Sequence, residues 1–168
     1  MIRAFPKWRA GVLGITGLAL LVSGSAQAAC IDQPMLSAAR LHEFETMMMD
    51  VSLRCNRIGV AMDIHYENMV VANRIRFEEA AHKLQHYFAL DAAKEAQHGG
   101  AYDSYATLIA NRYGGGNTSI DTCRVFDGIA NEIAIATDGG RMLGAVAQAM
   151  IVHPMLERAT CAANTRSR

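Results

Sequence analysis

Hydrophobic residues recur at helical spacing over the stretch 41–58. Apolar side chains there alternate by three and four positions, which is the stripe of an amphipathic helix that faces a core. The stripe consists of Leu41, Phe44, Met48, Val51, Cys55 and Ile58. Asp32 and Pro34 suit the first turn of such a helix, and Gly59 suits its end. We therefore predict one long helix that ends near residue 58.

The same periodicity predicts a second long helix, capped by Asp63 and continuing at least to Phe88. It either breaks near Asp91 or continues to Gln97, and Gly99-Gly100 ends it in both cases.

Three shorter helices complete the pattern. We expect one over 101–113, one capped by Thr118 or Ser119 that reaches about residue 137, and one over 141–152 that ends before Pro154. No stretch alternates with period two between turn residues, so we predict no strand. Short connections favour antiparallel neighbours. The expected fold is all-α, an antiparallel up-down bundle of about five helices.

The first 28 residues have the three-part layout of a secretory signal peptide. Basic residues come first, at Arg3, Lys7 and Arg9. An apolar run over 11–22 follows, and the small residues of Ala26-Gln27-Ala28 close the segment. The apolar run is shorter than the roughly 20 residues that a membrane-spanning helix needs. We expect cleavage after Ala28 or Ala29, a single mature domain over 29–161, a polar tail over 162–168, and a periplasmic or secreted protein.

Cleavage would change the charge balance of the chain. It leaves 13 basic against 16 acidic residues, a formal net charge of −3. Nucleic-acid binding calls for a basic face, so we expect no nucleic-acid partner. No later apolar run is long enough to anchor the mature chain in a membrane.

Four cysteines follow the leader, at Cys30, Cys55, Cys123 and Cys161. An even number in an exported chain suggests two disulfides. If 35–55 is one unbroken helix, it spans about 30 Å, whereas a disulfide needs Cα atoms within about 7 Å, so Cys30 cannot reach Cys55. Of the two remaining patterns we favour Cys55–Cys123 with Cys30–Cys161. Buried free thiols, or a lipid on Cys30, are the alternatives.

The stretch 101–116 contains the most suggestive cluster of polar and aromatic residues. The cluster consists of Tyr102, Tyr105, Asn111, Arg112 and Tyr113. Tyrosine and arginine together are typical of binding hot spots. Tyrosine at helical spacing is equally typical of a core residue whose hydroxyl reaches water.

We predict no catalytic residue, because no candidate nucleophile is accompanied by a base at the sequence spacing of a known catalytic motif. The sequence favours an exported binding or accessory protein with an unknown protein or small-molecule partner, and a small enzyme with its site near 102–113 is the alternative.

His82 and His86 lie four residues apart on a helix, one turn after Glu78. Two histidines at that spacing could bind a divalent metal weakly, although a solvated helix face explains the pattern as well.

Met47, Met48 and Met49 point about 100° apart on a helix and cannot converge on one copper ion, so we interpret them as packing residues. The chain has no haem-attachment, phosphate-loop or dinucleotide motif, and we expect no cofactor.

The segments Tyr102-Asp103-Ser104-Tyr105 and Leu108 to Gly114, together with Cys55 and the closing Cys161, resemble a group of small exported helical proteins of alphaproteobacteria. Some members of that group carry the label S-adenosyl-L-homocysteine hydrolase. The enzyme family of that name looks like a much longer cytosolic protein with a nucleotide-binding domain of the Rossmann type. This chain lacks the strand-glycine-helix fingerprint of that domain, so we disfavour the activity. The resemblance implies an exported helical protein and assigns no catalytic residue.

Overall fold

The computed structural model describes residues 31–92 and 100–157. The predicted leader, the tail over 162–168, Cys30, Cys161 and the continuation to Gln97 lie outside these residues. Within them the chain is all-α and forms no strand. The helices of ten or more residues are α1 (Gln33–Arg57), α2 (Asp63–Ala72), α3 (Arg74–Ala92), α4 (Ala101–Gly114), α5 (Ile120–Ile135) and α6 (Arg141–Met150). None of the helices in the described ranges is long and apolar enough to cross a membrane.

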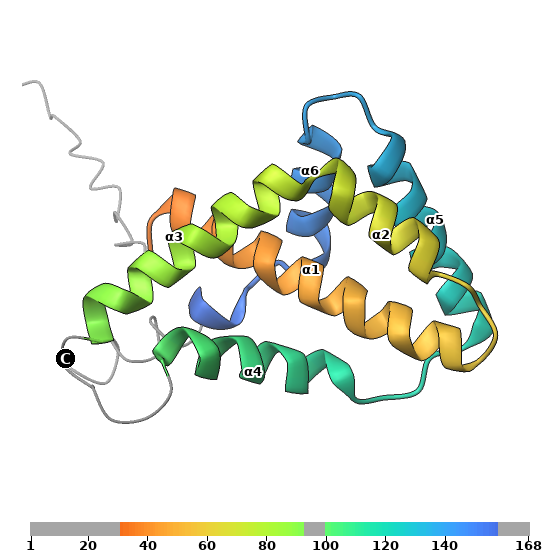
Figure 1. Ribbon diagram of the computed structural model, residues 1–168, viewed down its shortest axis with the longest axis horizontal. Helices are drawn as coiled ribbons and strands as arrows, with labels where there is room; N and C mark the ends of the chain where they lie inside the picture. Colours follow the sequence, from red (N-terminus) through yellow and green to blue (C-terminus); the bar gives the residue numbers. More distant parts are fainter. Residues whose placement is uncertain (1–30, 93–99, 158–168) are drawn as a thin grey trace, which may run out of the picture.

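Helix α1 lies at the centre of the molecule and contacts all five other helices (Figure 1). The predicted stripe is buried at Phe44, Met48, Val51 and Cys55, whereas Ile58 is 43% exposed. A second face of α1 is buried as well, at Leu36, Ala39, Glu43 and Met47. The single-stripe interpretation missed this second face, because a helix with partners on several sides buries more than one row of side chains.

Two apolar clusters meet along α1. The C-terminal half of α1 packs with side chains of α2, α5 and α6 and with Phe77 of α3. The N-terminal half packs with side chains of α3 and α4 and with Leu156 near the end of the chain. The sequence predicted one bundle of about five helices. The described residues form six helices of ten or more residues, and each half of α1 has a different set of partners.

The additional helix arises from a break at Asn73, where the sequence predicted one continuous helix. Asn73 is buried, only 5% exposed, and its side-chain amide donates to the carbonyl of Met69 at 3.1 Å. Asparagine side chains compete in this way with the hydrogen bonds of a helix. The chain bends there, so that α2 lies beside α5 while α3 lies beside α1 and α4 (Figure 1).

Two of the three helix starts for which a capping residue was predicted have that cap. Oδ1 of Asp32 accepts a hydrogen bond from the Met35 N–H at 2.8 Å, and Oγ of Ser119 accepts one from the Thr122 N–H at 3.1 Å. Both capping predictions are confirmed. The prediction for Asp63 is wrong, because Asp63 is already the first helical residue and Met62 precedes it without a side-chain cap.

The Cys55–Cys123 disulfide is confirmed. The two sulfur atoms are 2.08 Å apart and the Cα atoms 5.5 Å apart. Both cysteines are fully buried and join the end of α1 to the first turn of α5. The rigidity of α1 excluded Cys30 as the partner of Cys55, and of the two patterns that remained the favoured one contains the observed pair. The second predicted pair, Cys30–Cys161, lies outside the described residues.

Two glycines are expected to respond in opposite ways to alanine. Gly59 follows α1 with a φ of +88°, where a Cβ is strained, so Gly59→Ala should lower the free energy of unfolding by about 1 kcal/mol. Gly128 lies inside α5 and a Cβ there meets no atom within 4 Å, so Gly128→Ala should raise it by about 0.5–1 kcal/mol. Urea unfolding followed by circular dichroism measures both changes, and the same sign in both variants would contradict the argument.

Candidate functional site

The five predicted binding residues separate into groups on α4. Tyr105 is buried, Tyr102 and Tyr113 are half-buried, and Asn111 and Arg112 are exposed. Positions 102, 105 and 113 face the rest of the molecule. Asn111 lies on the outer side of α4 and joins neither tyrosine group. The structure therefore does not bring the five residues together as one site.

Tyr113 and Arg112 instead meet at Glu43, which the sequence analysis missed. Glu43 is completely buried on α1. One of its carboxylate oxygens accepts a hydrogen bond from the Tyr113 hydroxyl at 2.7 Å, and the other accepts one from the Met155 N–H at 2.8 Å. Nε of Arg112 lies 3.9 Å from the first oxygen. Burial and the hydrogen bond to Glu43 raise the pKa of Tyr113 to about 12.

These contacts make Glu43 a structural tie rather than a free reactive group. It joins α1, α4 and the segment after α6, which are far apart in the sequence. A sequence signal for it existed, because Leu36, Ala39, Glu43 and Met47 follow helical spacing as a second stripe. A carboxylate inside such a stripe predicts a buried anion that needs donors.

The other tyrosines form an aromatic group where α1, α3 and α4 meet. The ring centroid of His42 on α1 lies 5.6 Å from that of Tyr102 and 6.1 Å from that of Tyr105. Phe88 of α3 lies 5.1 Å from Tyr105 and 6.3 Å from Tyr102. Together with Glu45, one turn along α1 from His42, we call these residues the tyrosine seam.

Several polar atoms of the tyrosine seam are buried without partners. Neither ring nitrogen of His42 has a hydrogen-bond partner in the described part of the chain, and nor does the Tyr105 hydroxyl. Tyr105 is only 6% exposed, so water does not replace that partner freely. A buried polar group without a partner costs about 1–3 kcal/mol. The fold thus places three unsatisfied polar atoms in one small region.

Glu45 adds a negative charge to the tyrosine seam. It is half-buried and, among residues 31–92 and 100–157, makes no side-chain hydrogen bond or ion pair. Burial raises the pKa of its carboxyl group. Burial also raises the pKa of Tyr102, and the charge of Glu45 raises it further. Glu45 acts in the same direction on the pKa of Tyr66 of α2, so its carboxylate lies within electrostatic reach of both helices.

The predicted metal candidates lie elsewhere. His82 and His86 are exposed on α3, and Glu78 pairs with Arg74 at 3.2 Å. In the described ranges no three histidine, cysteine or acidic side chains gather as metal ligands. Weak metal binding at His82 and His86 stays a prediction that titration with Zn²⁺ or Ni²⁺ can test.

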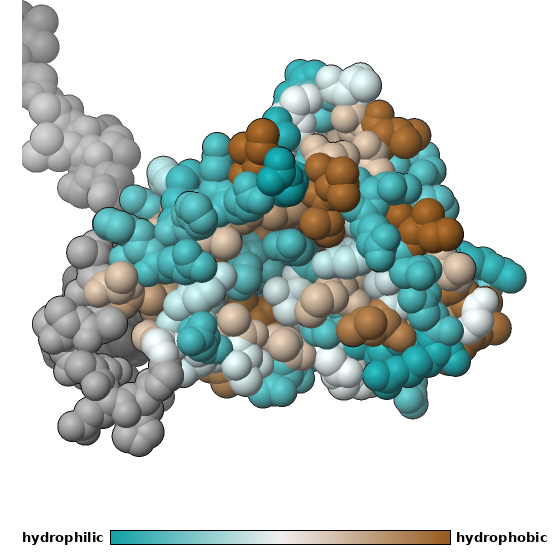
Figure 2. Space-filling view, in the orientation of Figure 1, coloured by the Kyte–Doolittle hydropathy of each residue, from teal (hydrophilic) through white to brown (hydrophobic). Residues whose placement is uncertain are grey.

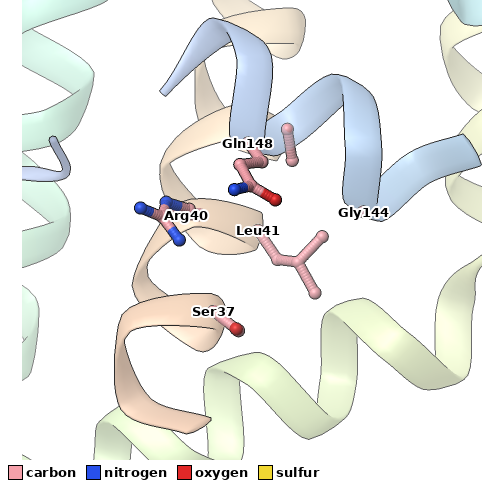
Figure 3. Close-up of a pocket in the computed structure, with 6 residues that line it drawn as sticks. Ser37, Arg40, Leu41, Gly144 and Gln148 are labelled. Atoms are coloured by element: carbon pink, nitrogen blue, oxygen red, sulfur yellow. The ribbon is translucent and has the colours of Figure 1, made fainter. Parts of the chain in front are cut away.

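A separate pocket of about 90 Å³ lies between α1 and α6 (Figure 3). Its lining residues are Ser37, Arg40, Leu41, Gly144, Ala147 and Gln148. Arg40 is already engaged, because its guanidinium donates to the carbonyls of Ile151 at 3.2 Å and Val152 at 3.1 Å. Given that a water molecule occupies about 30 Å³, the pocket has room for only a few waters. We interpret it as part of the junction between α1 and the end of α6.

The burial of His42 predicts a pH dependence of stability. Desolvation lowers the pKa of His42 below its ordinary value of 6.5, so the folded protein binds fewer protons there than the unfolded chain. Stability should therefore be highest above pH 6.5 and fall as the pH drops from 6.5 toward the lowered pKa. His42→Phe should flatten this part of the profile. Urea unfolding between pH 5 and 8 measures it, and identical slopes for the two proteins would contradict the assignment.

No protein family model, curated protein or solved structure matches the chain significantly. The resemblance to the exported alphaproteobacterial group stays a prediction.

Proposed function

We propose that the protein is an exported, disulfide-stabilised helical binding or accessory protein, and that its ligand site is the tyrosine seam. The leader-like layout of residues 1–28 supports export. The Cys55–Cys123 disulfide is consistent with it, because disulfides persist mainly in oxidising compartments.

The proposal includes the second disulfide, Cys30–Cys161. Ile31 and Leu156 support it, since both belong to the apolar cluster around the N-terminal half of α1. The described chain therefore begins and ends in the same part of the molecule. Peptide mass mapping of the mature protein without reductant should give a linked peptide with Cys30 and Cys161. A lipid mass on Cys30, or two free thiols, would overturn this part of the proposal.

The observation that carries the binding function is the set of unpartnered atoms on His42 and Tyr105. Polar groups buried for stability are normally satisfied within the fold. Groups that a ligand satisfies stay unsatisfied when the ligand is absent, and the empty protein is then less stable than it could be.

A pair of tyrosine variants distinguishes the two roles. Tyr105→Phe removes an unpartnered hydroxyl, so it should leave the stability of the ligand-free protein unchanged or raise it by about 1 kcal/mol. Tyr113→Phe removes the hydrogen bond to Glu43 and should lower it by about 1–2 kcal/mol. Urea unfolding measures both. A Tyr105→Phe variant as destabilised as Tyr113→Phe would show that the hydroxyl has a structural partner.

Binding itself can be tested on protein isolated from the periplasm with its disulfides intact. Native mass spectrometry should show a bound small molecule on the wild-type protein that Tyr105→Phe carries at reduced occupancy. Tyr113→Phe is the matched control, because it changes a tyrosine of the same helix outside the tyrosine seam. Equal occupancy in the wild type and in Tyr105→Phe would remove the tyrosine seam as the site.

A further inference from the structure

The chemistry of the tyrosine seam also indicates what kind of ligand it binds. We infer that the tyrosine seam recognises an organic cation with at least one N–H donor, that is, a primary or secondary ammonium group. This inference rests on the proposed function and adds the class of ligand to it. Three independent properties support it: the charge, the acceptors and the aromatic rings.

Among the described residues, the charged side chains that act on Tyr102 and Tyr105 are carboxylates. Glu45 of α1 and Asp103 of α4 both act on Tyr102, and Glu43 acts on Tyr105. Glu43 has partners, because Nε of Arg112 lies 3.9 Å from it and the hydroxyl of Tyr113 donates to it. Glu45 has no such partner among the described residues. A half-buried carboxylate without a counter-ion favours a cationic ligand and repels an anionic one.

The unpartnered atoms can act as acceptors for N–H donors. Burial lowers the pKa of His42, which keeps the imidazole neutral and leaves one ring nitrogen with a free lone pair. The Tyr105 hydroxyl oxygen also carries lone pairs, and no protein donor in the described chain uses them. An ammonium group has the N–H donors that these two atoms lack, and hydrogen bonds from a charged donor are the stronger kind.

The rings of the tyrosine seam favour the same ligand. The ring centroid of Phe88 lies 5.1 Å from that of Tyr105 and 6.3 Å from that of Tyr102. The faces of tyrosine and phenylalanine attract cations, and the attraction grows where water is excluded. Tyr102 and Glu45 are half-buried and reach solvent, whereas the Tyr105 hydroxyl and both His42 ring nitrogens are buried.

Four probes of similar size separate the alternatives: n-butylammonium, tetramethylammonium, n-butanol and butyrate. Binding can be followed by tyrosine fluorescence of the mature protein, because the only tryptophan, Trp8, precedes the predicted cleavage site. We expect n-butylammonium to bind at least about tenfold more tightly than n-butanol, and butyrate not to bind. Tetramethylammonium should bind more weakly than n-butylammonium, because it has no N–H group.

Variants connect the binding to the residues. Glu45→Gln should weaken n-butylammonium binding by about tenfold or more, and Tyr105→Phe should weaken it as well. Glu79→Gln is the matched control, since Glu79 is an exposed carboxylate on α3 away from the tyrosine seam, and it should leave the affinity unchanged.

The outcomes distinguish this inference from the proposed function. Equal affinity for n-butanol and n-butylammonium, or an unchanged affinity in Glu45→Gln, would overturn the cation assignment. A binding that still depends on Tyr105 would in that case leave the proposed site standing. If none of the four probes binds in a Tyr105-dependent way, the inference fails, and the native mass measurement decides the proposed function separately.

Discussion

Replacing Glu43 with alanine is expected to lower the free energy of unfolding by about 3 kcal/mol. The carboxylate is fully buried and accepts hydrogen bonds from the Tyr113 hydroxyl and the Met155 N–H. Alanine leaves both donors without an acceptor and removes the anion beside Arg112. The loss is large because the penalty includes the donors left unpaired, not only the bonds that are lost. Urea unfolding followed by circular dichroism measures the change.

Two controls test whether Glu43, Tyr113 and Met155 stabilise the fold as one hydrogen-bonded group. Glu43→Gln keeps one oxygen acceptor and should cost less than Glu43→Ala. The double variant of Glu43→Ala and Tyr113→Phe should cost less than the sum of the single changes, because both remove the same bond. Glu43→Ala should also speed proteolysis after α6, since the Met155 N–H loses its acceptor. A loss below 1 kcal/mol, with unchanged proteolysis, would contradict this role of Glu43.

Removing the Cys55–Cys123 disulfide is expected to lower stability by roughly 4 kcal/mol, which follows from the chain-entropy relation at a sequence separation of 68. For a domain of this size the melting temperature should fall by about 10 °C or more. The double variant Cys55→Ala with Cys123→Ala tests this without leaving a single free thiol.

Reductant provides the control for that experiment. It should lower the melting temperature of the wild-type protein, and any further effect on the double variant would report the proposed Cys30–Cys161 bond. A wild-type melting temperature that is the same with and without reductant would contradict the stabilising role of the disulfide.

Features with a local or geometric signal could be predicted from the sequence. Asp32 and Ser119 cap their helices through bonds within three residues, and the left-handed conformation of Gly59 is one that glycine favours. The length of one rigid helix excluded Cys30 as the partner of Cys55, and the antiparallel order of the helices favoured Cys123, which the structure confirms. Each of these depends on residues close in sequence or on a distance that a helix fixes.

Features that depend on distant partners could not be predicted in the same way. Asn73 interrupts the predicted second helix where its buried side-chain amide donates a hydrogen bond to the Met69 carbonyl. An asparagine with its side chain in solvent is compatible with a continuous helix, so the residue type alone did not predict the break. The role of Glu43 depends on Tyr113 and Met155, which lie 70 and 112 residues away in the sequence. The spacing of the tyrosines identified α4 as the helix of interest. Which tyrosine contacts Glu43 and which lie beside His42 depends on how α4 packs against α1, and the sequence does not show that packing.

The exposed surface differs from the tyrosine seam in its distribution of apolar residues. Large apolar side chains are exposed on several helices, including Leu53, Val71, Leu108 and Val125. On the face shown in Figure 2, hydrophobic residues form separate patches between hydrophilic ones. Scattered exposed apolar residues are normal for a folded protein, so we assign them no partner.

The position of α1 between two apolar clusters has a consequence for how the protein opens. Because α1 contributes side chains to both clusters, opening either cluster exposes one half of α1 to solvent. Amide protons near Leu41, which packs against both clusters, should therefore exchange with solvent only when the whole domain unfolds. The exposed ends of α2 and α5 should exchange earlier, so the order of exchange along the chain would follow distance from α1 rather than helix length.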